Sequence, residues 1–411
     1  MAAGEGQRRP LRICMVHQSD FAIDSRIQRE ARALAERGDE VDCVCLSEPA
    51  IIPVGEGVIR LHPAGDRKPS GSTGAYVRGY ASFFLSALRR VTRLDKARRF
   101  DLVEVHNMPD FLTLTAVRPK LRGAPVVLNI HDTFPELLAV MFGLGMDHPV
   151  VRLVKGKERG SAALADALIF VTDEAREHLG ARGVGNGNAH VVMNSPDESV
   201  FGPRRAPVEV PWSGPIRVVY HGGTAERFGV ECLIDAFGEL ATALPQAHLE
   251  IYGSGSDSAA LAERAATVAP GAIEVAPSPV PFEQIPDRLA GAHIGVVPTL
   301  RNEFTELLLP VKLLEYVHMG IPVVTSRLPV IERYFSDREV RFFEPGSPAS
   351  LAEAVRDVAD NPQAALRRAE RAGERLEEFS WQRQRERYTA LVDGLVPPRA
   401  APPRKPVLSV R

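Results

Sequence analysis

The chain has 411 residues, 50 Lys and Arg against 52 Asp and Glu, and 45% apolar residues. This size and balance exclude a disordered, fibrous or disulfide-held small protein, and they suggest two or three globular domains. The four cysteines show no zinc-type spacing and read as small core residues, which favours a reducing compartment. Since no apolar leader and no uncharged apolar stretch of about 18 residues is visible, we expect a cytoplasmic protein that is neither secreted nor membrane-spanning.

Short apolar runs alternate with amphipathic ones along the first half of the chain. This alternation is typical of strand–helix units that build a parallel sheet. Residues 25–38 are expected to form a helix that Gly38 ends. The expected strands are 11–17, 40–46, 102–106, 125–131, 167–172 and 189–194.

A basic segment interrupts this pattern. Between Arg60 and Arg99 the chain carries ten Lys or Arg against Asp66 and Asp95, and residues 83–99 combine apolar side chains at helical spacing with much of this charge. Such a helix can lie on an anionic membrane or bind a phosphorylated acceptor. The alternative is a core-facing helix with a solvated basic face. Nucleic-acid binding is not expected, because the segment lacks aromatic stacking residues and the whole chain is not basic.

The second half repeats the architecture after a Pro- and Gly-rich segment, 195–215, which we interpret as an interdomain linker. We therefore divide the chain into a first domain over 1–200, a second over 201–379, a helix over 380–396 and a disordered tail over 397–411. Strands are expected at 216–222, 247–253, 272–277, 294–298 and 322–326, and helices at 231–244, 307–320 and 380–395.

Two doubly wound domains place a ligand cleft at the carboxyl ends of their strands. The loop after the first strand has no glycine, which argues against a nicotinamide-binding G-x-G-x-x-G loop. In the second domain, HGGTAERFG (221–229) offers Gly222 and Gly223 for close backbone approach and Arg227 for an anion. A plain glycine-rich turn is the alternative interpretation.

A second candidate anion site is LLLPVKLLEY (307–316). Pro310 at a helix start leaves the first-turn amides free, and Lys312 adds a positive charge. Glu315, three residues further on, can address a neighbouring part of the same ligand, which suits a phosphate next to a ribose. An exposed Lys–Glu helix pair is the alternative.

The first domain contributes HNMPD (106–110) and HDTFPE (131–136), each directly after an expected strand. His131 and Asp132 would then face the cleft, where a histidine can donate a hydrogen bond to a sugar or a diphosphate. A structural histidine is the alternative.

Together these motifs resemble the retaining GT-B glycosyltransferases of the family-four group, which use nucleotide sugars. The resemblance runs from MVHQSDFAIDSRIQREARALAERGDEV through HNMPDFL, LNIHDTFPELL and VVYHGGTAERFGV to LPVKLLEYVHMGIPVVTS and the closing FSW (379–381). It implies an α/β fold of two Rossmann-like domains that face a cleft, with the last helix crossing back to the first domain. It also implies transfer of a sugar from a nucleoside diphosphate to an acceptor hydroxyl, without a metal or other cofactor.

The resemblance also implies site residues. Catalytic roles fall on His131, Arg227 and Lys312, and acceptor binding falls on His17, Asn107 and Asp132. The donor-binding residues would be Gly222, Gly223, Arg227, Glu306, Leu309, Pro310, Lys312 and Glu315. The acceptor stays open between lipid-linked, polysaccharide and small-molecule compounds, and residues 83–99 suggest peripheral contact with the inner face of the membrane.

The chain departs from the family pattern at three positions. Leu307 stands where the first glutamate of the E-x7-E motif is expected, and Gly223 and Phe228 stand where the family has Arg and Lys. These departures keep two alternatives open: a sugar-nucleotide 2-epimerase of the same fold, and a non-catalytic partner that binds nucleotide sugars.

Overall fold

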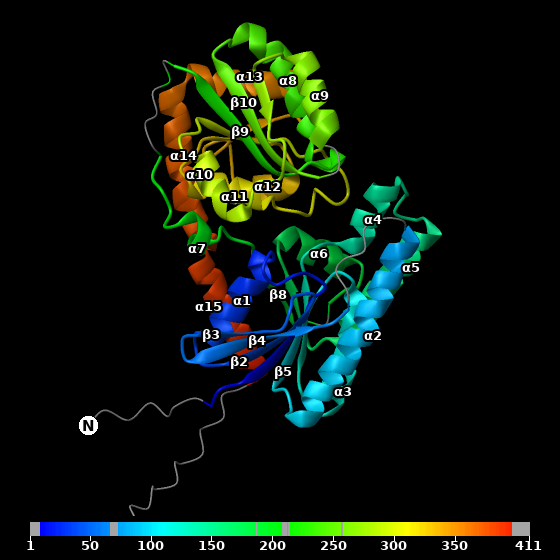
Figure 1. The fold of residues 1–411 in the computed structure, drawn as a ribbon. Helices are drawn as coiled ribbons and strands as arrows, with labels where there is room; N and C mark the ends of the chain where they lie inside the picture. The colour runs from blue at the N-terminus through cyan, green and yellow to red at the C-terminus, as the bar shows by residue number, and fades with distance from the viewer. Residues whose placement is uncertain are drawn as a thin grey trace, which may run out of the picture.

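The chain folds into two α/β lobes, each built around its own sheet (Figure 1). The computed structural model describes residues 9–65, 73–185, 187–207, 212, 214–255 and 258–396. The tail expected to be disordered, 397–411, lies outside the described residues. Both lobes are the Rossmann-like units that the sequence predicts.

The first lobe contains an eight-stranded sheet in the order β3-β4-β2-β1-β5-β6-β7-β8, parallel except for β3 against β4. Its inner strands, such as β1 and β6, are buried along their whole length because helices cover both faces of the sheet. The strand order reverses between β1 and β5. The strands are β1 (Arg12–Val16), β2 (Glu40–Cys45), β3 (Ala50–Val54), β4 (Gly57–Pro63), β5 (Leu102–His106), β6 (Val126–Ile130), β7 (Ala167–Phe170) and β8 (Ala189–Val191).

Alternate side chains of β1 supply the two cores of this lobe. Cys14 and Val16 join the core that receives Phe83 of α2, whereas Ile13 and Met15 join the core that receives α1 and α15. The basic helix therefore packs its apolar face on the sheet. The helices up to the second lobe are α1 (Ser25–Ala35), α2 (Thr73–Ala97), η1 (Asp110–Ala116), α3 (Val117–Leu121), α4 (Phe134–Phe142), α5 (Pro149–Leu164), α6 (Asp173–Ala181) and α7 (Glu198–Phe201).

The second lobe has a six-stranded parallel sheet in the order β11-β10-β9-β12-β13-β14, which reverses between β9 and β12. Its strands are β9 (Ile216–Gly223), β10 (Ala247–Ser254), β11 (Ile273–Val275), β12 (Ile294–Val297), β13 (Val323–Ser326) and β14 (Arg341–Phe343). Its helices are η2 (Glu226–Phe228), α8 (Val230–Ala243), α9 (Ser258–Val268), η3 (Phe282–Gln284), α10 (Ile285–Leu289), α11 (Val311–His318), α12 (Pro329–Tyr334), α13 (Pro348–Asp360) and α14 (Pro362–Leu376).

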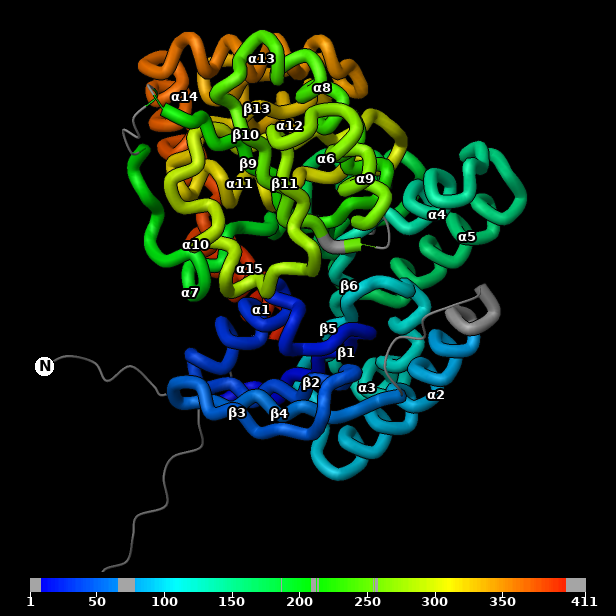
Figure 2. Tube along the Cα trace, turned by 45° about the horizontal axis from the view of Figure 1, so that its top comes forward, coloured from blue at the N-terminus to red at the C-terminus, as the bar shows by residue number. Residues whose placement is uncertain are grey.

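The chain then returns to the first lobe through η4 (Glu377–Phe379) and α15 (Trp381–Leu395), which lies against α1 in both views (Figures 1 and 2). Arg37 pairs with Asp393 at 3.0 Å, and Arg385 pairs with Glu36 at 2.6 Å. The expected crossing helix is therefore present. Among the described residues, no helix has both the length and the hydropathy needed to cross a membrane.

The structure differs from the sequence predictions in three local details. The expected linker 195–215 holds the short helix α7, where Asp197 caps the helix and Phe201 is fully buried against Phe282. The helix expected over 307–320 begins only at Val311, because a residue before proline is pushed out of the helical region and Pro310 occupies the cap. The antiparallel strands β3 and β4 were not predicted.

Candidate active site

The amino group of Lys312 lies against the carboxyl end of strand β9 in the second lobe. Its Nζ donates a hydrogen bond of 2.7 Å to the hydroxyl of Tyr220 and lies 4.0 Å from the centre of that ring. Gly222 has a φ of +108°, and a Cβ added there would lie 3.0 Å from this Nζ. Burial lowers the pKa of Lys312 to about 7. The amino group of Lys312, which is positively charged when protonated, therefore lies where β9 meets the start of α11.

Glu315 lies one turn further along α11 and is buried. Its Oε2 is 3.2 Å from Nε2 of His221, and the backbone N–H of His221 donates to the hydroxyl of Tyr316. Burial raises the pKa of Glu315 to about 7 and lowers the pKa of His221 to about 3. The imidazole is therefore neutral at physiological pH, and the carboxyl group is held within reach of the Lys312 site.

Arg227, in the short helix η2, is the second basic residue on the second-lobe side of the site. Its guanidinium lies 4.7 Å from the ring centre of Phe228 and 5.9 Å from that of Phe304. Among the described residues its buried Nε has no hydrogen-bond partner. Burial lowers the Arg227 pKa, whereas the charge of Asp132 in the first lobe raises it. Arg227 and Asp132 are therefore near each other across the cleft.

On the first-lobe side, Asn107 holds the loop that carries His131. The Asn107 Oδ1 accepts from the backbone N–H of His131 at 2.8 Å. Its Nδ2 donates to the carbonyl of Asp132 at 2.7 Å and to Oδ1 of Asp110 at 3.0 Å. This bonding occupies the amide, so Asn107 positions the loop rather than offering free groups to an acceptor.

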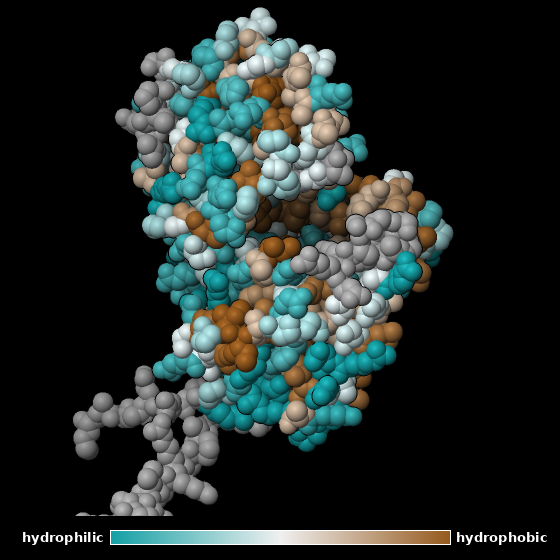
Figure 3. Space-filling model, in the orientation of Figure 1, coloured by the Kyte–Doolittle hydropathy of each residue, from teal (hydrophilic) through white to brown (hydrophobic). Residues whose placement is uncertain are grey.

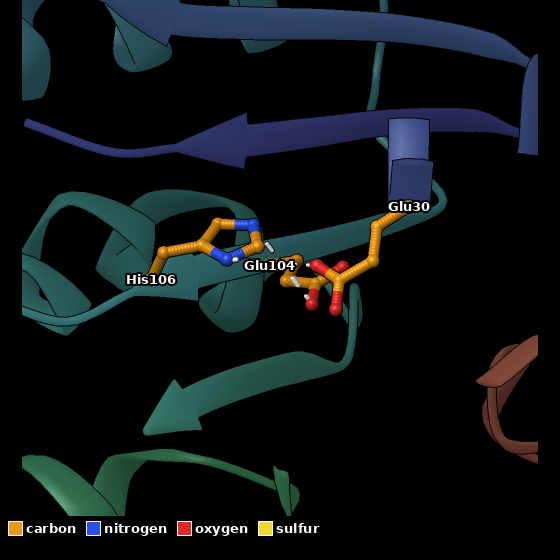
Figure 4. Close-up of side chains that lie close together, drawn as sticks. All are labelled: Glu30, Glu104 and His106. Atoms are coloured by element: carbon orange, nitrogen blue, oxygen red, sulfur yellow. Dashed lines mark ion pairs between the residues drawn. The ribbon is translucent and has the colours of Figure 1, made fainter. Parts of the chain in front are cut away.

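His131 contacts a buried cluster of three side chains, Glu30, Glu104 and His106, which Figure 4 shows. The Nδ1 of His106 is 3.0 Å from Nε2 of His131, 3.7 Å from Glu30 and, through its other nitrogen, 3.9 Å from Glu104. Burial raises the pKa of Glu104 to about 7 and lowers the pKa of His106 to about 3. The hydroxyl of Tyr388, on the returning helix α15, donates to Glu104. Helix α15 therefore contacts Glu104, one of the residues that pack around His106 and His131.

The two lobes also touch directly around the cleft. Thr172 Oγ1 donates to the carbonyl oxygen of Leu307 at 2.8 Å, and the backbone N–H of Asp173 donates to the hydroxyl of Tyr334 at 3.0 Å. Arg29 donates to the carbonyl of Ser195, at the point where the chain leaves the first lobe. The segment before α11 is therefore anchored on the first lobe.

The sequence matches two protein-family models in tandem. Residues 22–195 match the glycosyl transferase 4-like domain, and residues 215–361 match the glycosyl transferases group 1. The chain belongs to the GT-B glycosyltransferases. A curated relative, glycogen synthase of Mycobacterium tuberculosis H37Rv, is 26% identical over 285 residues. The match covers 63% of this chain and 66% of that protein, so the chain spans just under two thirds of its length.

Solved structures share the GT-B fold over nearly the whole chain. Sucrose-phosphate synthase from Thermosynechococcus elongatus superposes with a TM-score of 0.72 at 16% identity, over 94% of this chain and 99% of that one. Anabaena HepE, solved with UDP and glucose, gives a TM-score of 0.67 at 13% identity, over 93% of this chain and 100% of that one. At these identities the likeness establishes the fold alone.

Three of the residues expected to bind the donor or the acceptor, Leu309, Glu306 and His17, direct their side chains to other contacts. Leu309 packs its side chain into the second-lobe core, so only its backbone can face a donor. Glu306 turns to Arg301, with Oε1 3.7 Å from Nε, and is partly exposed. His17 is buried next to His106, and its Nδ1 lies 3.0 Å from Ser19 Oγ. Pro310 is present as the cap of α11, and a Cβ on Gly223 would lie 2.8 Å from the Phe228 ring.

The sequence motifs did not reveal three residues that contact the site residues or the junction between the lobes: Tyr220, His221 and Arg29. Tyr220 and His221 stand directly before the glycine pair, and Arg29 lies 166 residues before Ser195, whose carbonyl it contacts. For His221, its place at the end of an apolar strand was the available signal. Nothing in the local sequence marks Arg29, whose guanidinium also lies 5.3 Å from the ring centre of Trp381.

Proposed function

We propose that this chain transfers a glycosyl group from a nucleoside diphosphate sugar to an acceptor hydroxyl, with retention of the anomeric configuration. The observation that carries the proposal is the convergence of Lys312, Gly222 and Arg227 opposite the His131–Asp132 loop. Departure of the diphosphate concentrates negative charge on its oxygens, and preorganised cations stabilise that charge. In this proposal Glu315 binds the ribose and His131 contacts the sugar.

The proposed chemistry needs no metal, because the ammonium group of Lys312, the guanidinium of Arg227 and the first-turn amides of α11 supply the positive charge. For retention, the acceptor attacks from the face that the diphosphate leaves, and an oxygen of the leaving group takes the acceptor proton. We propose UDP as the first nucleotide to test, supported by the HepE complex with UDP and glucose.

We also propose that the reaction takes place in the cytoplasm at the inner face of the membrane. The basic surface of α2 supports this location, since the cytoplasmic leaflet carries a negative surface potential that attracts Lys and Arg.

A thermal-stability panel tests the donor site. We expect one nucleoside diphosphate among UDP, GDP and ADP to raise the melting temperature of the full chain, equally in EDTA and in Mg²⁺, because binding to the folded state stabilises it. The same rise is expected for Arg367→Met, a change at an exposed arginine of α14, and not for Lys312→Met. A rise that requires Mg²⁺ would contradict metal-independent binding.

Turnover assays separate the reaction classes. With the donor that the panel selects, we expect slow release of the diphosphate to water and fast release once a suitable acceptor is present, and NMR of the product should show the donor's anomeric configuration. Conversion of donor alone into an isomer would identify a 2-epimerase. Tight binding without turnover in any acceptor mixture would identify a binding partner.

The affinity for UDP is expected to fall as the pH rises from 7 to 9, a range in which the phosphates of UDP are already ionised. With pKa values of Lys312 and Glu315 both at about 7, this titration removes a positive charge and adds a negative one beside the diphosphate. Calorimetric titrations across this range test the effect, and Lys312→Met should flatten the profile. An affinity that does not change with pH would contradict this placement of the two groups.

A further inference from the structure

A deep apolar groove opens in the first lobe, outside the donor site. It has a volume of about 1100 Å³ and runs between α2, η1, α4 and α5. Its walls are mostly aromatic and aliphatic, including Phe84, Phe111, Leu138 and Leu164, and Lys157 is the charged residue among the lining residues that the structure describes. Helices α4 and α5 (134–164) form what we call the α4–α5 arm. Figure 3 shows apolar residues in the hollow between the lobes and over this arm. Pockets for small ligands reach about 1,000 Å³, so this groove is as large as the largest of them, and its apolar walls suit a hydrocarbon chain.

The inner end of the groove adjoins the acceptor side of the cleft. Met108 and Pro109 line the groove directly after Asn107, whose amide binds the backbone of His131 and Asp132. Phe134, two residues after Asp132, also lines it. A molecule with its apolar part in the groove therefore reaches the loop opposite Arg227 with its polar end.

The helices that wall the groove expose charges of one sign, and the loop between α4 and α5 adds one exposed acid, Asp147. Across the described residues of α2, α4 and α5, the solvent-facing ionisable side chains are all Lys or Arg, nine in total: Arg78, Arg89, Arg90, Arg93, Lys96, Arg152, Lys155, Lys157 and Arg159. The acids on these helices are buried: Asp95 lies against Arg118 and Arg122, and Glu136 and Glu158 both lie against Arg182. This surface therefore attracts an anion and repels a second copy of itself.

Large apolar side chains stand in solvent at the outer end of the same arm. Met141 and Phe142 close α4 with exposed fractions of 59% and 57%, and Val150 and Leu153 open α5 with 46% and 63%. Exposed apolar residues next to Lys and Arg are the pattern of a surface that dips into an anionic membrane.

We propose that this groove binds the hydrocarbon chain of a phosphate-bearing membrane lipid that is the acceptor, while the α4–α5 arm rests in the membrane surface. The groove holds the chain, the Lys and Arg side chains around it attract the phosphate, and the acceptor hydroxyl is thereby presented at the His131 loop. This inference rests on the proposed function, since it names the class of the acceptor.

Two glycines of α5 provide a matched pair of variants. Gly160 lines the groove, Gly156 one turn earlier does not, and a Cβ at either position would meet nothing within 4 Å. Phenylalanine at either site replaces a helical glycine without a backbone clash, and it favours the helix. Gly160→Phe therefore fills the groove, whereas Gly156→Phe leaves it open.

The test uses farnesyl phosphate as the probe, with binding to the full chain followed by displacement of a fluorescent apolar dye. We expect saturable binding by the unaltered chain and Gly156→Phe, binding at least tenfold weaker by Gly160→Phe, and no displacement by inorganic phosphate. Equal binding by both variants, no binding at all, or displacement by inorganic phosphate would overturn the inference. UDP affinity, measured on the same three proteins, should be equal, and its loss in all three would count against the proposed function alone.

Discussion

Replacing Lys312 with methionine is expected to lower the turnover number by about 10²–10³-fold, the usual effect of deleting one preorganised group that stabilises a developing oxyanion. The Lys312 Nζ lies at the junction of Gly222, Tyr220 and the start of α11, whereas the guanidinium of Arg227 lies beside Phe228 and makes neither of these two contacts. The measurement is the initial rate of diphosphate release from the donor that the thermal panel selects.

The fold should not suffer from this change. Burial lowers the pKa of Lys312 to about 7, so the folded state disfavours the charged form that the unfolded chain prefers below its ordinary pKa of about 10.4. Tyr220 keeps a partner, because its hydroxyl also donates to the carbonyl of Gly223. We therefore expect a melting temperature equal to or above that of the unaltered chain. Turnover close to that of the control variant Arg367→Met would exclude Lys312 from transition-state stabilisation.

The repeated strand–helix pattern made both lobes predictable, because continuous apolar runs such as residues 167–170 have few alternatives to a buried parallel strand. The hairpin of β3 and β4 was missed for a physical reason. Pro53 lies on the edge strand β3 and Pro63 is the last residue of β4. Proline usually indicates the end of a strand, although an edge strand tolerates it. The helix α7 was missed because its four residues are too few for a helical period to show.

Residues of the site that lie within one motif were predictable. Lys312 and Glu315 share one helix, and Gly222 ends the strand beside them. The cluster behind His131 was not, since Glu30, Glu104 and Tyr388 come together only through the packing of α1, β5 and α15. For the same reason the nearness of Arg227 and Asp132 depends on how the two lobes meet, which no local pattern encodes.

Gly229→Ala is expected to lower the free energy of unfolding by about 2–4 kcal/mol, within the range of severe local clashes. Gly229 joins η2 to α8 with a φ of +68°, and a Cβ there would lie 1.8 Å from the carbonyl oxygen of Pro298. Either that segment or the loop carrying Arg227 must move. Because Leu300 donates its backbone N–H to the carbonyl of Arg227 at 2.9 Å, the shift should also weaken UDP binding at least tenfold.

Gly271→Ala separates the two causes of this loss. Gly271 has a φ of +78°, close to that of Gly229, but a Cβ there would meet nothing within 4 Å. Its substitution should therefore cost only the left-handed conformation, about 1–2 kcal/mol, and leave UDP binding unchanged. Thermal and urea unfolding of both variants, with UDP titrations, make the comparison. If the two variants lose the same stability and bind UDP equally well, the close approach of Gly229 to Pro298 does not hold the Arg227 loop in place.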